Sequence, residues 1–186
     1  MMEKVTSPQE RFERLYAEHR LDVLAYCTRR MNADAADACS ETFLVAWRRI
    51  EDIPSPPGTL PYLYGIAGRI IANQLRALRR RSRLEEKLRS LGVAPAPQPS
   101  VLIVQSPQDQ KVMAALSRLK PKDREIVMLY TWEELTRNAI AEMMGMTRDA
   151  IDQRIHRSYL RLARILETSS NPRPVPSPPI AEKEGT

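Results

Sequence analysis

The chain is poor in the residues that build disulfide scaffolds, membrane spans and catalytic centres. Its 186 residues include only two cysteines, Cys27 and Cys39, and two histidines, His19 and His156. So few cysteines exclude a disulfide-stapled small scaffold and fit a reducing compartment. The longest aliphatic run, VLIV at residues 101–104, is far shorter than the ~20 apolar residues that span a bilayer, and the first residues lack the apolar core of a signal peptide. We therefore expect a cytoplasmic protein without membrane insertion.

Catalytic and cofactor motifs are also missing. The two histidines fall in different halves of the chain, and no glycine-rich phosphate loop, nucleophile elbow or paired metal-ligand motif occurs. Cys27, Cys39 and His19 lack the close pairing that zinc sites use, so cysteines that pack as small apolar residues are the better explanation. We expect no enzyme activity, no catalytic residue, no metal and no cofactor.

Proline, which cannot continue a helix interior, is absent from residues 9–53, 62–94 and 122–171. Glycine is sparse in these stretches, whereas alanine, leucine, arginine and glutamate are abundant, so each stretch is expected to be helical. Strand signals are nearly absent. The sequence therefore predicts an all-α protein made of two small helical domains joined by a flexible linker, the C-terminal one a helix-turn-helix.

Composition divides the chain into five expected segments. They are an N-terminal extension (1–9), a first helical module (10–90), a proline-rich linker with little charge (91–109), a second helical module (110–167) and a disordered proline-rich tail (168–186). Within the first module we expect two helices separated at residues 32–34, a loop at 51–61, and a long helix from Tyr62 to Leu91.

The positive charge is concentrated in one segment. The formal net charge is +6, and residues 69–89 hold eight basic and two acidic residues, whereas residues 1–68 hold eight basic and ten acidic ones. An excess confined to one helix is an electrostatic footprint for a polyanion. Tyr62 and Tyr64 precede the arginines, and this combination suits single-stranded or melted nucleic acid, although at least one tyrosine is expected in the core.

Residues 136–166 have the pattern of a helix-turn-helix, with an ordinary helical hairpin as the alternative. Ile140 and Ala141 are followed by Gly145 and then by Ile151, which indicates a short helix, a turn and a second amphipathic helix. The side chains expected to point inward on the second helix are Ile151, Ile155, Tyr159, Leu162 and Leu166. Those expected to face a major groove are Arg148, Asp149, Asp152, Gln153, His156 and Arg157.

Three segments occur in an order that points to one family. They are DACSETFLVAWRRI, then LPYLYGIAGRIIANQLRALRRR, and then ALSRLKPKDREIVMLYTWEELTRNAIAEMMGMTRDAIDQRIHR. With them the chain resembles a bacterial RNA polymerase sigma factor of the sigma-70 family, extracytoplasmic function (ECF) group, over about residues 10–90 (region 2) and 110–167 (region 4). The resemblance implies a subunit of core RNA polymerase that reads the minus-thirty-five element of promoter DNA as duplex. It would also melt the minus-ten element, hold its non-template strand, and have an anti-sigma factor as a possible further partner.

The resemblance also implies roles for individual residues. Those matching the polymerase-binding segment are Asp37, Ser40, Glu41, Phe43 and Trp47, of which Phe43 and Trp47 are expected to be largely core. Those matching the minus-ten segment are Tyr62, Tyr64, Arg69, Asn73, Arg76, Arg79 and Arg80. Those matching the minus-thirty-five segment are Arg148, Asp149, Asp152, Gln153, Arg154, His156 and Arg157.

Three positions depart from the family's usual pattern. Ser40 replaces a usual glutamine, Arg69 and Asn73 replace a usual asparagine and aspartate, and Asp152 stands where a basic residue is common. An acidic group on a recognition helix repels phosphate but accepts a hydrogen bond from a cytosine amine. The sequence therefore predicts an unusual minus-thirty-five preference, with Asp152 as its determinant.

Two other classes of protein remain open. A free-standing helix-turn-helix regulator would bind operator DNA without polymerase, but such proteins usually dimerise. The chain shows no dimerisation heptad, and this reading leaves the first module unexplained. The other class is an enzyme acting on nucleic acid, but the chain lacks candidate catalytic groups for one.

The apolar run VLIV at residues 101–104 of the linker is expected to pack on a module or a partner.

Overall fold

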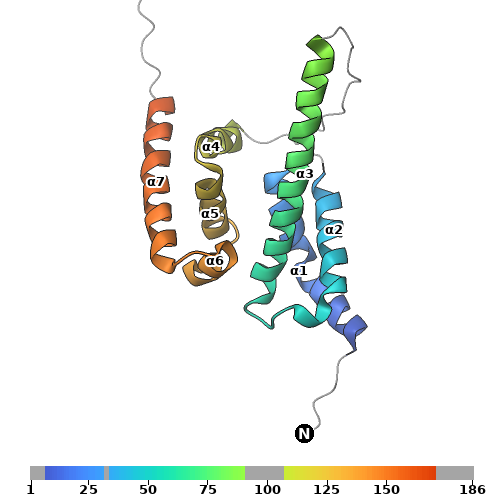
Figure 1. The fold of residues 1–186 in the computed structure, drawn as a ribbon. Helices are drawn as coiled ribbons and strands as arrows, with labels where there is room; N and C mark the ends of the chain where they lie inside the picture. Colours follow the sequence, from blue (N-terminus) through green and yellow to red (C-terminus); the bar gives the residue numbers. More distant parts are fainter. Residues whose placement is uncertain (1–6, 32–33, 91–106, 171–186) are drawn as a thin grey trace, which may run out of the picture.

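The computed structural model describes residues 7–31, 34–90 and 107–170, and no strand occurs in these ranges. The first module consists of α1 (Pro8–Arg30), α2 (Ala35–Arg48), a 3-10 turn η1 (Ile50–Asp52) and α3 (Thr59–Ser90). The second module consists of α4 (Pro107–Ser117), α5 (Pro121–Thr131), α6 (Arg137–Met144) and α7 (Arg148–Ser170). Figure 1 shows the two groups of helices side by side. The predicted all-α fold is confirmed, whereas the run at residues 101–104 and most of the tail lie outside the described residues.

Local hydrogen bonds fix several helix ends. Ser7 and Glu10 form a reciprocal capping box at the start of α1. Thr136 Oγ1 accepts a hydrogen bond from the backbone N–H of Ala139 at 3.2 Å, which caps α6. Gly145 ends α6 with φ at +61°, in the left-handed region that glycine adopts without steric cost. The predicted turn between two helices therefore has a specific backbone basis.

Three helices begin earlier than predicted. Helix α1 starts at Pro8, inside the segment predicted as N-terminal extension. The long helix α3 starts at Thr59 rather than Tyr62, and Pro61 lies in its first turn, where proline removes no hydrogen bond. Likewise α4 starts at Pro107, inside the segment predicted as linker. In each case a proline lies in the first turn, a position that accepts proline although the residue favours a loop elsewhere.

The core of the first module lies where α1, α2 and α3 meet, and Val23, Cys27 and Leu63 are completely buried there. Phe43 is also buried, as predicted. Trp47 is 41% exposed, so its placement in the core was wrong. The buried face of α2 runs through residues 35, 38, 39, 42, 43 and 46, and Trp47 falls at its edge, where its ring meets Phe12 edge-on at 5.2 Å.

In the second module the helix-turn-helix pair α6 and α7 packs through Ile140 and Ile151, both completely buried. The inward face of α7 continues through Ile155 and Ser158. Tyr159 and Leu166 are exposed, contrary to prediction. The buried positions of α7 are 151, 155 and 158, spaced by four and then three residues, and Tyr159 lies outside this repeat.

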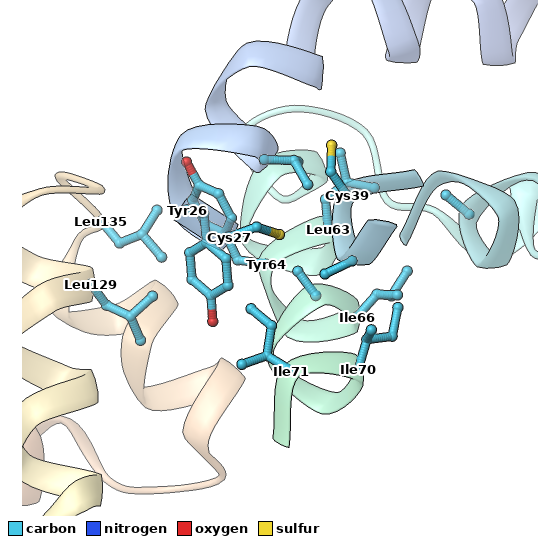
Figure 2. Close-up of a cluster of buried hydrophobic side chains, with 14 of the residues drawn as sticks. Tyr26, Cys27, Cys39, Leu63, Tyr64, Ile66, Ile70, Ile71, Leu129 and Leu135 are labelled. Atoms are coloured by element: carbon cyan, nitrogen blue, oxygen red, sulfur yellow. The ribbon is translucent and has the colours of Figure 1, made fainter. Parts of the chain in front are cut away.

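The hydrophobic core extends from one module into the other, which the sequence did not indicate. Figure 2 shows Leu129 and Leu135 of the second module beside Tyr26 and Tyr64 of the first. Within the first module, Gly68 of α3 leaves room for Tyr26 of α1, since a Cβ there would lie 3.0 Å from the Tyr26 hydroxyl. Helix α3 packs on α6. The modules therefore form one packed body.

The described part of the chain lacks a membrane-spanning helix and a metal-binding cluster. None of these helices is long and apolar enough to cross a membrane. Within residues 7–31, 34–90 and 107–170, no group of three or more histidine, cysteine, aspartate or glutamate side chains is arranged to hold a metal ion.

We expect the protein to lose stability as the pH rises above about 9. Burial, with a smaller contribution from Cys39, raises the pKa of Cys27 from 9.0 to about 12. The unfolded thiol ionises first, so above pH 9 the folded state binds more protons and the free energy of unfolding falls with pH. Urea unfolding at pH 7.5 and 10 measures this slope. Cys27→Ala should be less stable at both pH values but show a shallower decrease, and an unchanged slope would contradict this explanation.

Candidate polymerase and nucleic-acid interfaces

The exposed face of α2 carries the residues matched to polymerase binding. Asp37, Ser40 and Glu41 are exposed. The Ser40 hydroxyl donates to the Ala36 carbonyl at 2.9 Å, and the Glu41 carboxylate accepts from Gln74 Nε2 of α3 at 3.1 Å. Among these three, Asp37 has no hydrogen bond to its side chain in the described part of the chain.

An exposed apolar patch that the sequence analysis missed lies beside these polar groups. Leu44 and Trp47 of α2 and Tyr16 of α1 are its large exposed members. The Tyr16 ring contacts Phe43 at a centroid distance of 4.9 Å. Polar groups next to an apolar patch are typical of a protein–protein interface. The exposure of Leu44 could have been predicted from the sequence, because this apolar residue lies outside the repeat of buried positions in α2.

A stripe of polar and basic side chains runs along α3. Arg69, Asn73, Arg76 and Arg80 follow at intervals of three or four residues, which places them on one face, and all are exposed. Asn73 and Arg76 are joined, because Arg76 donates to the Asn73 side-chain oxygen. Arg79, the neighbouring predicted residue, is exposed as well. The four arginines can present positive charge to a phosphate backbone, and the Asn73 amide can donate a hydrogen bond to it.

The two tyrosines at the start of α3 differ in exposure. Tyr62 is half-buried, whereas Tyr64 is 3% exposed and stacks on Tyr26 with a centroid distance of 4.7 Å. Burial raises the pKa of Tyr64 above its ordinary value. The expectation that at least one tyrosine is core is confirmed, and in this conformation Tyr64 cannot stack on a base.

A cavity of about 830 Å³ lies between the modules. The α3 stripe supplies Arg69, Asn73 and Arg76 to one wall, and the second module supplies Arg124 and Met144 to the other. The arginines on both walls make the cavity suited to an anion. Tyr62 and Arg80 do not line it.

Helix α7 presents five of its seven predicted DNA-facing side chains to solvent. These are Arg148, Asp149, Gln153, His156 and Arg157. The other two are half-buried and paired within the module. Arg154 forms an ion pair with Asp123 at the start of α5.

The Asp152 carboxylate lies between two arginines. Arg137 Nε is 3.0 Å from Oδ1, off the direction of a hydrogen bond, and Arg148 Nε is 3.8 Å from Oδ2. The Asp152 carboxylate is therefore held near two arginines in this conformation, and its predicted effect on the minus-thirty-five preference stays a prediction. The sequence analysis considered only α7 and missed Arg137, which comes from α6.

The two modules match two family models from one family. Residues 15–81 match the model described as Sigma-70 region 2, and residues 109–162 match the model described as Sigma-70, region 4. Both matches lie within the helical modules, and region 4 includes the helix-turn-helix pair.

Individual relatives carry the same family name. A probable RNA polymerase sigma factor, RfaY, from Xanthomonas campestris pv. campestris is 27% identical over 145 residues, which is 76% of this chain and 36% of that protein. The ECF RNA polymerase sigma factor BldN from Streptomyces coelicolor is 32% identical over 182 residues, which is 89% of this chain and 66% of that protein. Each match therefore spans less than two-thirds of the relative's own length.

A solved structure shares the fold. The sigma factor RpoE, in complex with the anti-sigma factor NepR from Bartonella quintana, matches with a TM-score of 0.59 at 21% sequence identity, covering 84% of this chain and 96% of that one. Because two matching regions occur in the same order on one helical chain, the protein belongs to the sigma-70 family of RNA polymerase sigma factors, in its ECF group.

Proposed function

We propose that the protein is a cytoplasmic sigma factor that binds core RNA polymerase and directs initiation at specific promoters, without chemistry of its own. The observation that carries this proposal is the presence of regions 2 and 4 together, in order, on one chain. A free-standing regulator needs only the helix-turn-helix, which leaves the whole first module without a role. The boundaries proposed for the two functional domains are residues 10–90 and 110–167.

Each exposed surface then has a proposed partner. The α2 face, with Asp37, Ser40, Glu41 and the Leu44–Trp47 patch, binds the polymerase. The α3 stripe, together with the half-buried Tyr62, binds the melted minus-ten strand, because arginines contact phosphates and a tyrosine ring stacks on an unpaired base. Tyr64 supports this face from the core, where it stacks on Tyr26. The exposed side of α7 reads the minus-thirty-five duplex from the major groove.

An anti-sigma factor is a further proposed partner. RpoE, which shares the fold, is described in complex with one. A protein that covered the apolar patch on α1 and α2 would compete with the polymerase for the same surface.

Transcription with purified core polymerase tests this function. A pool of random promoter templates is transcribed with core polymerase alone and with the protein added. We expect initiation that requires the protein at templates sharing two elements about two duplex turns apart. Sequence-specific binding to duplex DNA without any effect on initiation would instead support the regulator.

Replacing Asp152 with alanine should raise the affinity for all duplex DNA. The change removes a negative charge near the phosphates and frees Arg137 and Arg148, and one added phosphate contact increases the magnitude of the salt slope by about 0.9. Binding to matched and mismatched minus-thirty-five duplexes over a salt series measures this effect. Glu142→Ala, an exposed acidic site on α6, is the control. A changed base preference with an unchanged salt slope would contradict this expectation and would support a direct contact between Asp152 and a base.

A further inference from the structure

A polar pocket lies between the start of α5 and the middle of α7, entirely within the second module. The two helices pack against each other (Figure 1), and the pocket has a volume of about 290 Å³. Four basic side chains line it, against a single carboxylate. Its polar lining residues are Lys120, Asp123, Arg154, Arg157, Ser158 and Arg161. Lys120, Ser158 and Arg161 were not among the residues predicted to bind DNA.

Three of the four basic side chains are available to a ligand. Arg154 forms an ion pair with Asp123, which neutralises the one carboxylate. Lys120 and Arg161 are exposed, and neither has a side-chain partner in the described part of the chain. Arg157 donates from Nε to a carbonyl of its own helix at 3.2 Å, which leaves its two terminal nitrogens for other contacts. The pocket therefore has an excess of positive charge, which attracts an anion.

The backbone at the start of α5 adds donors on the same side. Helix α5 begins at Pro121, and its N-cap residue Lys120 makes no side-chain hydrogen bond to the first turn. The N–H groups of the first turn of a helix have no partner within the helix, and the helix dipole favours negative charge at this end. An anion in the pocket can accept hydrogen bonds from these groups.

The buried hydroxyl of Ser158 distinguishes the pocket from a solvated basic surface. Ser158 is only 4% exposed, and it lines the pocket. Its hydroxyl has no hydrogen bond within residues 7–31, 34–90 and 107–170. A buried polar group without a partner lowers stability, and most such groups in proteins are paired. An acceptor atom of a ligand in the pocket supplies the missing partner.

We propose that this pocket binds a phosphate group. A phosphate has acceptor oxygens on several sides, which matches donors that come from the α5 backbone, from the Ser158 hydroxyl and from the basic side chains of both helices. A carboxylate presents only two oxygens on one side and leaves part of these donors unused. We call the site the phosphate pocket.

On a promoter, the phosphate belongs to the DNA backbone beside the minus-thirty-five element. Arg157 lines the phosphate pocket and is also exposed on the side of α7 proposed to enter the major groove, so a strand that borders the groove passes close to the pocket. Phosphate contacts fix the register of a protein on the duplex but carry no sequence information. The phosphate pocket would therefore set where α7 enters the groove. This step rests on the proposed function, whereas binding of phosphate itself does not.

Inorganic phosphate alone tests the pocket itself. The backbone amide NMR signals of Lys122 and Asp123 are followed while phosphate is added at constant ionic strength. We expect saturable shifts, and a dissociation constant at least about tenfold higher in Ser158→Ala, because a hydrogen bond to a charged group is lost. Ser117→Ala, at an exposed serine that ends α4, is the matched control and should bind as the parent does. Shifts that never saturate, or equal constants in the parent and Ser158→Ala, would overturn the pocket as a site for free phosphate.

Duplexes with one neutral linkage test the DNA backbone as the source of the phosphate. A duplex is selected from a random pool by binding to the parent, and a methylphosphonate then replaces one backbone phosphate at a time. At one linkage we expect binding to weaken at least about tenfold for the parent but less than about twofold for Lys120→Gln/Arg161→Gln, which has already lost the contact. Lys111→Gln/Arg118→Gln removes the same charge from exposed positions outside the pocket and should respond as the parent does.

The combined outcomes separate the two sources and the proposed function. If parent and pocket variant respond alike at every linkage while inorganic phosphate binds, the DNA backbone is overturned as the source and a free phosphate is the ligand. If neither the linkage effect nor saturable phosphate binding is found, the phosphate pocket itself is overturned. If the linkage effect is found but the parent fails to support transcription with core polymerase, the proposed function falls and the phosphate pocket stands.

Discussion

Ile151→Ala is expected to reduce the free energy of unfolding by about 2–5 kcal/mol. Ile151 is 0% exposed at the contact between α6 and α7, and alanine leaves a cavity there because the surrounding side chains relax only partially. Because a domain of this size is stable by only about 5–15 kcal/mol, we also expect promoter-specific transcription to fall at growth temperature. Urea unfolding followed by circular dichroism measures the loss.

The matched control is Leu160→Ala on the same helix. Leu160 is 49% exposed, so its truncation should change stability by no more than about 0.5 kcal/mol. Equal losses in the two variants would show that α7 packs by a different face.

Arg76→Gln/Arg79→Gln should reduce promoter opening by the holoenzyme at least about 100-fold. A hydrogen bond to a charged group contributes about 1.5–3 kcal/mol, and both arginines are exposed on or beside the α3 stripe. Permanganate reactivity of the minus-ten thymines measures opening, and the salt slope of single-strand binding should become shallower by about 1.4.

Arg14→Gln/Arg20→Gln removes the same charge from exposed positions on α1 and serves as control. If both double variants lose opening equally, overall charge rather than the α3 stripe supports strand binding. If neither does, the strand contacts a different surface of region 2.

Short-range periodicity in the sequence was enough to predict the helices and the core of each module. The turn at Gly145 and the buried contacts of Ile140 and Ile151 follow from spacings of a few residues, so they were predicted correctly. Errors arose where a residue sits at the margin of a helical face. Trp47 and Tyr159 are each one position away from the buried repeat, and apolar character alone placed them inside.

Contacts between distant segments could not be predicted. Arg29 and Arg30 have the pattern of solvated charges on α1, and Glu125 and Glu133 have the same pattern in the second module. In the structure Arg30 pairs with Glu125 and both arginines pair with Glu133, across 95 to 104 residues of sequence that no local repeat relates. Asp152 shows the same difficulty at shorter range, because its partner Arg137 belongs to the preceding helix.

The distance along the chain between the arginines of α1 and their glutamate partners, Glu125 and Glu133, sets an order of assembly during synthesis. Glu133 follows Arg29 by 104 residues, so at about 5–20 residues per second it leaves the ribosome roughly 5 to 20 s later. In that interval Tyr26 and the two arginines have no partner from the second module. A nascent chain, or one truncated before α5, therefore exposes these side chains of α1, and their contacts with the second module form only when synthesis nears completion.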